Sequence, residues 1–357
     1  GSAGVAFALH DSTTNIYYEF HINWVRLCPV CVPRQSAVFK EEPVMQAVQY
    51  ERFGSPEVLK MVDVATPVPG RGEIRVTVRA AGLNPLDWKV FGGMTGGDPS
   101  QLPQGVGRDY SGVVDATGEG VTDFTAGDAV LGTVRGAPGL GMTSGSLAEE
   151  LVVPADWVVH KPDALGFTEA AALGVASQAA AGALRTLGLS AGDAIVISGA
   201  SGGVGSLAVQ LAVHRGATVI GIAGEQNLDH VRSLGAIPVA YGENLESRVL
   251  SATPAPVTRF LDCHGTGYID LALGIGLAPD AIATLVPSPE AIANGVLVTG
   301  SRDSLPDDLP HVADLVSRGA IKVHVAHAYP FEIEDVREAY TELRKGHVRG
   351  KLVVSLS

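Results

Sequence analysis

The sequence predicts an α/β protein with two domains, a mostly antiparallel β domain and a doubly wound parallel sheet. With 357 residues, 46% of them apolar and 44 of them glycine, the chain can bury two ordinary cores without disulfides or a metal. Short β-type runs punctuated by glycine and proline fill its first part, whereas strands and helices alternate in its second part. A glycine-rich turn joins a strand to a helix within that second part.

Residues 1–44 show no sustained period, and a regular strand pattern begins only after Met45. We expect them to be an extension outside the fold, because the initial Gly-Ser resembles the scar of a cleaved tag and Met45 resembles a natural start. A secretory signal is not expected, since a basic start and a long apolar core are both missing. Cys28 and Cys31 have the spacing of a redox or half-zinc site, but without a second ligand pair we expect no function there.

The β domain is expected to comprise residues 45–165 and 318–357. Its predicted strands in the first segment lie at 46–50, 73–81, 109–117, 129–132 and 148–154. The end of the chain is predicted as strand, helix and strand, at 322–331, 333–345 and 351–356. We expect this end to return to the β domain, because the parallel sheet already has six strands.

The parallel sheet is expected within residues 166–317. An alanine-rich run predicts a helix at 168–187 that bridges the domains, with Thr168 as its N-cap. Six strands are predicted beyond this helix, at 194–198, 218–223, 237–240, 258–262, 281–286 and 295–299. Strands that alternate with helices in this way are typical of a doubly wound sheet.

The turn after the first of these strands indicates a dinucleotide site. It reads Ala200, Ser201, Gly202, Gly203, Val204, Gly205. Compared with G-x-G-x-x-G, Ala200 replaces the first glycine, Gly202 keeps a side-chain-free approach to phosphate, and Gly205 keeps a close helix-to-strand contact. The helix expected at 203–215 then offers free N–H groups and a positive dipole to a pyrophosphate. A plain tight turn is the alternative, but strand, turn and helix together favour the cofactor.

Charge and cysteine content exclude several classes of protein. A formal net charge of −13 argues against nucleic acid or an anionic membrane as the main partner. Three cysteines, Cys28, Cys31 and Cys263, are too few for a disulfide framework and favour a cytoplasmic location. No apolar run reaches the length of a transmembrane helix.

Several motifs occur in the order typical of one enzyme family. They are VRAAGLNPLDWKV (78–90), GRDYSGVVDATGEGVTDFTAGDAVLG (107–132), ASGGVG (200–205), VRSLGA (231–236) and HVRGKLVV (347–354). Through them, residues 45–357 resemble zinc-independent medium-chain dehydrogenases/reductases of the quinone oxidoreductase branch. This resemblance implies a GroES-like β domain and a Rossmann domain. In zinc-dependent relatives a catalytic cysteine follows the strand at 76–81 and four close cysteines bind structural zinc. No cysteine lies between Cys31 and Cys263, so we expect no metal.

The resemblance implies NAD(P)H-dependent reduction of a quinone or an α,β-unsaturated carbonyl. Without zinc, the charge that develops on the substrate oxygen must be met by N–H, O–H or ammonium donors. Asn84 and Lys89 are the candidates, in a loop that resembles the family's segment beside the nicotinamide. The alternatives are a turn residue before a proline for Asn84 and a solvated side chain for Lys89. We expect Asp87 to orient this loop and Tyr110 to pack inward.

The end of the second parallel strand bears on the choice between NADPH and NADH. An NAD-selective site would place an acid there, but the strand ends at Ala223 and Gly224, which leaves space for a 2′-phosphate. The resemblance places Asn227 and Tyr241 at the adenosine-phosphate contacts. Glu225 keeps NADH as the alternative, because a carboxylate turned inward would repel the phosphate. The cationic partner of that phosphate is expected from elsewhere, Arg232 or Arg248.

Two loops at strand ends and one lysine complete the candidate site. We expect backbone at Cys263 and Thr299 to bond the nicotinamide carboxamide, since ligands lie beyond the carboxyl ends of parallel strands. His264 is expected to be a surface or capping residue rather than an acid. Lys351, in the family's G-K pattern, either approaches the cofactor or caps the final strand.

A small quinone or enone is the expected partner, bound by a homodimer that extends the parallel sheet through residues 295–301. Two other classes stay open. One is a non-catalytic NADPH-binding protein, like relatives recruited as lens crystallins, and the other is a tailoring enoyl reductase that acts on a carrier-bound thioester. The substrate itself is set by loops such as 135–144, which are glycine-rich and hold no readable motif.

Overall fold

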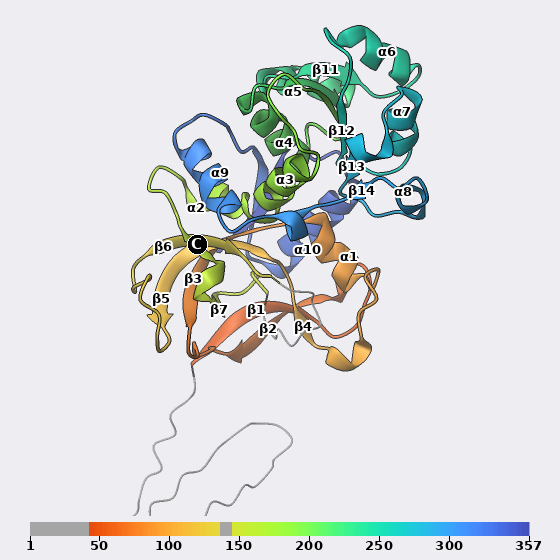
Figure 1. Ribbon diagram of the computed structural model, residues 1–357. Coiled ribbons are helices and arrows are strands. Elements are labelled where there is room, and N and C mark those ends of the chain that lie inside the picture. The colour runs from red at the N-terminus through yellow and green to blue at the C-terminus, as the bar shows by residue number, and fades with distance from the viewer. Residues whose placement is uncertain (1–42, 136–144, 357) are drawn as a thin grey trace, which may run out of the picture. The chain divides into compact units, whose positions relative to one another are not determined.

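The computed structural model describes residues 43–135 and 145–356, and its elements are labelled in Figure 1. Within these residues lie a seven-stranded, a six-stranded and a three-stranded sheet. An antiparallel sheet domain and a parallel sheet with helices are therefore both present, which confirms the predicted fold class. The expectations for Cys28 and Cys31, and for the loop at 136–144, concern residues outside the described part.

The seven-stranded sheet is antiparallel except for one pair at its edge. Its strand order is β15-β16-β3-β5-β6-β8, with β7 also paired to β3, and only β15 and β16 run parallel. The end of the chain lies in this sheet, because Val353 of β16 pairs with Gly82 of β3. The strands are β3 (Glu73–Gly82), β5 (Asp109–Thr117), β6 (Ala129–Thr133), β7 (Glu150–Pro154), β8 (Val158–His160), β15 (Val325–Pro330) and β16 (Lys351–Ser355).

A small antiparallel sheet joins β1 (Val44–Tyr50), β2 (Leu59–Ala65) and β4 (Gln104–Gly105). The strand at β1 was predicted, but β2, β4 and β8 were not. β4 and β8 have only two and three residues, too few for a period-2 pattern to emerge. Short edge strands of this kind depend on tertiary pairing, so sequence alone does not predict them.

The six-stranded sheet is parallel throughout and has the order β11-β10-β9-β12-β13-β14. Its strands are β9 (Ala194–Ile197), β10 (Thr218–Ala223), β11 (Ile237–Ala240), β12 (Arg259–Asp262), β13 (Ile282–Thr284) and β14 (Leu297–Val298). Each strand begins and ends within two residues of its predicted position. The helices of the described chain are α1 (Pro85–Phe91), α2 (Phe167–Ala171), α3 (Gly174–Thr186), α4 (Gly203–His214), α5 (Leu228–Ser233), α6 (Leu245–Ala252), α7 (Tyr268–Gly274), α8 (Pro289–Ala293), α9 (Asp308–Ser317) and α10 (Ile333–Lys345).

The single helix predicted at 168–187 is wrong, because the structure has two helices there, α2 and α3. Thr168 is not the N-cap of α2. That position is Gly166, whose N–H donates to the carboxylate of Glu169 at 3.2 Å. The helical run is interrupted before α3, where a carboxylate of the antiparallel sheet meets the start of the second helix. The N–H of Val175 donates to Oδ1 of Asp109 at 2.8 Å. This hydrogen bond joins the start of α3 to β5.

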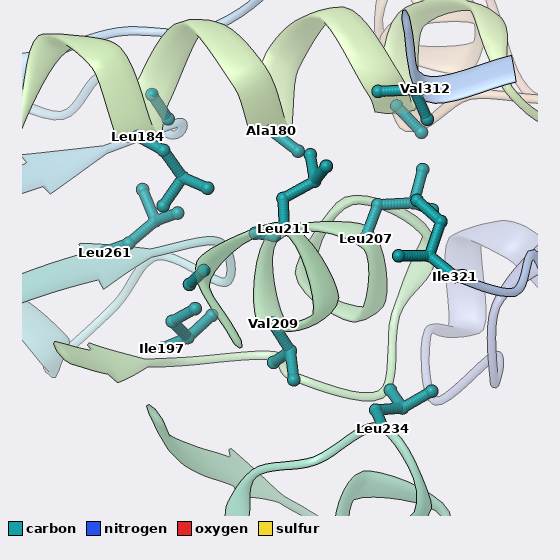
Figure 2. Close-up of a cluster of buried hydrophobic side chains, with 14 of the residues drawn as sticks. Ala180, Leu184, Ile197, Leu207, Val209, Leu211, Leu234, Leu261, Val312 and Ile321 are labelled. Carbon is teal, nitrogen blue, oxygen red and sulfur yellow. The ribbon is translucent and has the colours of Figure 1, made fainter. Parts of the chain in front are cut away.

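Helix α4 is buried between α3 and the parallel sheet (Figure 2). Leu207 and Leu211, four residues apart, point away from the sheet, Leu211 toward Ala180 of α3 and Leu207 toward Val312 of α9, while Val209 points the other way. All of these side chains are buried, and a helix that is apolar on opposite faces belongs in a core. The packing fixes the start of α4 against the end of β9, where the glycine-rich turn lies.

Candidate active site

The glycine-rich turn differs from its predicted form at the first position. Gly199, rather than Ala200, adopts the left-handed conformation, with φ +59°, so the tight turn lies one residue earlier than the motif comparison suggested. Gly205 makes the close contact expected of it, since a Cβ there would lie 2.1 Å from the carbonyl oxygen of Gly199. A Cβ on Gly203 would lie 2.7 Å from Cδ of Lys351, so that lysine's stem crosses the helix start.

The start of α4 fits an anionic group. Gly202 is its N-cap, and a Cβ there would meet only the carbonyl oxygen of Gly199, at 3.3 Å. The N–H groups of Val204 and Gly205 make no hydrogen bond to any residue that the structure describes, whereas the N–H of Gly203 faces the carbonyl oxygen of Gly350 in a parallel bridge. Unpaired N–H groups at the positive end of a helix dipole, beside a position without a side chain, are suited to a pyrophosphate.

A groove passes this helix start. Its wider part, a cavity of about 490 Å³, and its narrower part, about 200 Å³, share Gly199, Gly202 and Cys263 in their walls. The predicted cofactor residues that line the wider part are Ser201, Gly202, Gly224, Asn227, Tyr241 and Cys263. Those that line the narrower part are Gly202, Gly203, Val204, Gly205, Cys263 and Lys351, together with Asn84. The structure thus brings most of these residues to one groove.

A cation that the sequence analysis missed, Arg349, contacts the groove residue Asn227 without lining either part of the groove itself. Arg349 Nε donates to Oδ1 of Asn227 at 2.8 Å, and its guanidinium also donates to the carbonyl oxygen of Gln226 at 3.1 Å. Arg232 instead pairs with the exposed Asp229. Neither Arg232 nor Arg248 lines the groove, and neither does Glu225, which is exposed.

The loop after β12 is organised by a buried carboxylate. Asp262 accepts hydrogen bonds from Ser198 Oγ, Thr284 Oγ1 and the N–H groups of His264 and Gly265, at 2.6 to 3.0 Å. This arrangement places His264 in the wall of the wide part. The loop is therefore held in place before any ligand arrives.

Cys263 and Thr299 have their hydrogen bonds within the protein. The N–H of Cys263 donates to Ser198 Oγ at 3.0 Å, which leaves its carbonyl as the group that can face a carboxamide. Burial and the nearby Asp262 raise the pKa of the Cys263 thiol well above its usual range. Thr299 Oγ1 donates to Asp303 at 2.8 Å, the residue is buried, and it lines neither part of the groove.

The segment that holds Asn84 is a helix start rather than the predicted loop. Asn84 is the N-cap of α1, Pro85 follows as its first residue, and Asp87 Oδ2 accepts the N–H of Asn84 at 2.8 Å. The expectation that Asp87 orients this segment fits that capping bond. Lys89 lies on α1 with Nζ 5.9 Å from the centre of the Trp88 ring, and it lines neither part of the groove.

A buried ion cluster holds the Asn84 side chain. Lys351 Nζ donates to Oδ1 of Asn84 at 2.6 Å and to the carbonyl oxygen of Leu83 at 2.8 Å, and it lies 3.6 Å from Asp109 Oδ2. The Nδ2 group of Asn84 donates to the same Asp109 oxygen at 2.9 Å. Lys351 is 5% exposed and Asp109 fully buried. Lys351 was expected either to approach the cofactor or to cap the final strand. It lines the narrow part of the groove, where it holds the side chain of Asn84.

Asp87 extends this cluster toward Arg108. Its Oδ1 lies 3.9 Å from Arg108 Nε and accepts no hydrogen bond from the residues described, whereas its Oδ2 accepts one from Tyr340 at 3.3 Å. Burial raises the pKa of Asp87 to about 7, against the opposing effects of the Asn84 N–H and Arg108. Tyr110 packs in the core of the antiparallel sheet, as expected, and burial raises its pKa.

A further pocket of about 380 Å³ adjoins the groove. Leu86 and Val175 line it, and their chain neighbours Pro85 and Ala176 line the narrow part of the groove. The other lining residues are Arg108, Thr133, Val134, Arg135, Gln178, Ser301, Arg302 and Ser304. The sequence analysis singled out none of them except Arg135, as the first residue of a loop. We call this the arginine pocket.

Two searches of the described residues gave no site of another kind. In residues 43–135 and 145–356, no three His, Cys, Asp or Glu side chains are grouped so that they could hold a metal ion. Among the helices of the same residues, none has the length and apolar character needed to cross a membrane.

Comparisons with known proteins agree with this architecture. Residues 70–163 match the alcohol dehydrogenase GroES-like domain, and residues 238–354 match the zinc-binding dehydrogenase family. A chloroplastic quinone oxidoreductase of Triphysaria versicolor is 31% identical over 87% of this chain and 98% of its own length. An NADPH-dependent alkenal/one oxidoreductase of Arabidopsis thaliana, also chloroplastic, is 32% identical over 87% of this chain and 79% of its own length.

Solved structures lead to the same family. The quinone oxidoreductase from Coxiella burnetii superposes with a TM-score of 0.77 at 29% identity, over 88% of this chain and 100% of the other. Sequence motifs, the two kinds of sheet and relatives matched over nearly their full length all agree. The chain belongs to the quinone oxidoreductase branch of the medium-chain dehydrogenases/reductases, a family of nicotinamide-dependent oxidoreductases.

Proposed function

We propose that the protein is an NADPH-dependent reductase of quinones or α,β-unsaturated carbonyls that works without zinc. The observation that carries this proposal is the groove, which runs from Gly224 past the start of α4 to Asn84. Relatives named as quinone oxidoreductases and as an alkenal/one oxidoreductase support the substrate class. The lack of cysteine between Cys31 and Cys263 supports catalysis without zinc.

Contacts at both ends of the groove fit NADPH. The unpaired N–H groups of Val204 and Gly205 would hold the pyrophosphate. Beyond Ala223 there is no inward acid, and Arg349 lies behind Asn227, so this end favours a 2′-phosphate. When bound, NADPH supplies the hydride that the acceptor takes up at its β carbon. An enone's electron pair then moves to the carbonyl oxygen, and a proton from water completes the reduction.

Asn84 is the donor that we assign to the developing oxyanion. A lysine ammonium can only donate and a carboxylate can only accept. The contacts with Lys351 and Asp109 therefore assign the oxygen and the nitrogen of the Asn84 amide. One hydrogen of Nδ2 is bonded to Asp109, and the other has only a long contact of 3.5 Å to the Gly82 carbonyl oxygen. That second hydrogen is available to an oxygen in the groove, and the adjacent ammonium strengthens it as a donor.

Cofactor titration followed by an acceptor panel tests this proposal. NADPH should bind more tightly than NADH, and Arg349→Gln should weaken NADPH roughly tenfold while it leaves NADH unchanged, because it removes one charged contact. Asn84→Ala should lower kcat about a hundredfold with NADPH affinity retained. The panel includes quinones, alkenals and an enoyl thioester. Binding of NADPH without turnover of any acceptor would show a non-catalytic binding protein instead.

We also propose a homodimer in the cytoplasm. The strand β14 is the edge of the parallel sheet and pairs only with β13 among the described strands, so a second copy could extend the sheet there. A monomeric mass in light scattering would refute the dimer. Two plant relatives are named chloroplastic, so fractionation of cells that express the protein should compare cytosol with plastid.

A further inference from the structure

The wall of the wide part of the groove carries no formal charge where β10 ends. Of the residues that the structure describes, no Asp, Glu, Lys or Arg lines this part. Sites that select strongly at the adenosine ribose use a charged side chain, an acid for a 2′-hydroxyl or an arginine for a 2′-phosphate. Glu225 and Arg349, the two charged residues beside this end, line neither part of the groove. Direct contact with the 2′ position therefore falls to neutral groups.

The amide of Gln226 occupies the place that a side chain at position 224 would take. A Cβ on Gly224 would lie 2.8 Å from Oε1, 2.9 Å from Nε2 and 3.0 Å from Cδ of Gln226. This amide thus lies against the end of β10, where an NAD-selective site carries its acid. Gln226 lines the wide part of the groove, whereas its neighbour Glu225 is exposed and lines neither part.

The side chain of Gln226 has no partner that would fix its orientation. It forms no hydrogen bond with any residue in the described ranges, and it is exposed, so water meets it. An amide offers two N–H donors at one end and a carbonyl acceptor at the other, with nearly the same shape. Either end of the Gln226 amide can therefore face the groove.

The backbone that carries this amide is held by hydrogen bonds. The N–H of Asn227 donates to the carbonyl oxygen of Gly224 at 2.8 Å. Arg349 donates to the carbonyl oxygen of Gln226 at 3.1 Å and to Oδ1 of Asn227 at 2.8 Å. A fixed backbone keeps the amide of Gln226 beside Gly224 while its side chain remains able to turn.

We propose that Gln226 contacts the 2′ position of the adenosine ribose and sets the cofactor preference. Its N–H group donates to a 2′-phosphate, and with the amide turned round its carbonyl oxygen accepts a hydrogen bond from a 2′-hydroxyl. This inference rests on the proposed reductase function and names the residue that selects its cofactor. A neutral donor gains less from a phosphate than a cation does, so the protein should prefer NADPH moderately and still bind NADH.

Two fragments that differ only in the 2′-phosphate test the inference by calorimetry, adenosine 2′,5′-bisphosphate and adenosine 5′-monophosphate. The parent protein should bind the bisphosphate roughly tenfold more tightly, the scale of a hydrogen bond to a charged group. Gln226→Met keeps the length of the side chain without a donor or acceptor, and should remove most of this preference. Gln226→Glu should reverse it to about tenfold in favour of the monophosphate, because a carboxylate accepts from the hydroxyl and repels the phosphate.

Glu225→Gln is the matched control, since it makes the opposite change one residue away, at an exposed side chain outside the groove. It should leave the ratio of the two affinities within about twofold of the parent value, because solvent screens the charge. His264 and His347 also line the wide part, so His264→Gln and His347→Gln are measured beside it. A ratio that changes in any of these three variants, but not in Gln226→Met, overturns the inference.

Binding of the fragments needs no turnover, which separates this inference from the proposed function. If the Gln226 variants change the ratio as expected while no quinone or enone is reduced, the reductase proposal fails and the role of Gln226 stands. If acceptors are reduced but the parent, Gln226→Met and Gln226→Glu share one ratio, the inference alone fails. Thermal unfolding checks that the variants are folded, as the exposed position of Gln226 favours.

Discussion

The groove along α4 and the arginine pocket beside α1 present positive charge by different means. The groove offers the backbone N–H groups of Val204 and Gly205, which are adjacent in the chain. The pocket offers side chains from three distant places, Arg108, Arg135 and Arg302, that only the folded chain brings together. Recognition by backbone depends on spacing and can be read in a sequence, whereas recognition by side chains depends on tertiary structure and cannot.

The largest effect is expected on stability, at Lys351, which lines the narrow part of the groove. Lys351→Met would leave Asp109 and Asn84 without their cationic partner, and removing one member of a buried ion pair costs on the order of 3–5 kcal/mol. Urea unfolding measures this loss. Lys322→Met is the control, since Lys322 is exposed and its replacement should change the free energy of unfolding by less than about 0.5 kcal/mol. Similar values for both variants would contradict a structural role for Lys351.

Two glycines of the groove should separate folding from binding. Gly205→Ala places a methyl group 2.1 Å from the Gly199 carbonyl oxygen and should destabilise the protein by about 2–3 kcal/mol. Gly202→Ala meets only one atom, at 3.3 Å, so it should cost less than about 0.5 kcal/mol. NADPH affinity should nevertheless fall roughly tenfold in Gly202→Ala. Thermal unfolding and fluorescence titration check the pair, and an equal loss of stability in both would reject the assignment.

The stability of the protein is expected to depend on pH through Asp87, which faces Arg108 of the arginine pocket. In the unfolded chain this carboxyl titrates near 3.8, whereas in the folded protein its pKa is raised to about 7. Between these values the folded state binds the extra proton, so the free energy of unfolding falls as pH rises. Asp87→Asn keeps an acceptor for the Asn84 N–H and should flatten this fall by a few kcal/mol, on the order expected for such a shift. Urea unfolding at pH 4.5 and pH 7.5 measures it, and an unchanged slope would refute the assignment.

The smallest effect is expected at Lys89, which lines neither cavity of the groove nor the arginine pocket. Lys89→Ala removes its contact with the Trp88 ring, worth about 0.5–1 kcal/mol at an exposed site. Its kcat should stay within about twofold of the parent enzyme, a change of less than about 0.5 kcal/mol in the barrier. Steady-state kinetics decides, and a large fall in kcat would restore Lys89 as a donor to the substrate.

The parts that could be predicted from sequence are those with a local period or a local spacing. Strands of the parallel sheet are continuous apolar runs, and all six lie where they were predicted. Helix α1 was missed because Asn84, Pro85 and Asp87 are also turn residues, and seven residues show no clear period. The division into α2 and α3 was missed because nothing local shows that Asp109 meets the start of α3.

The roles of Lys351 and Arg349 depend on pairing between distant strands. Lys351 reaches Asn84 only because β16 pairs with β3, and Arg349 reaches Asn227 from two residues before that strand. From the sequence alone, Lys89 was therefore a more plausible partner for Asn84 than Lys351, which only the fold brings to it. Contacts between strands far apart in sequence leave no periodic signal to read.

The lysine stem that crosses the start of α4 has a consequence for variation at these positions. The absence of a side chain at Gly203 is required by the protein itself, since a Cβ there would meet Lys351 at 2.7 Å. Substitutions at the two positions should therefore be epistatic: a methyl group at 203 that is harmful beside lysine becomes tolerable once residue 351 is shortened. Gly203 belongs to a motif associated with phosphate binding, but its lack of a side chain is thus required by a contact within the chain.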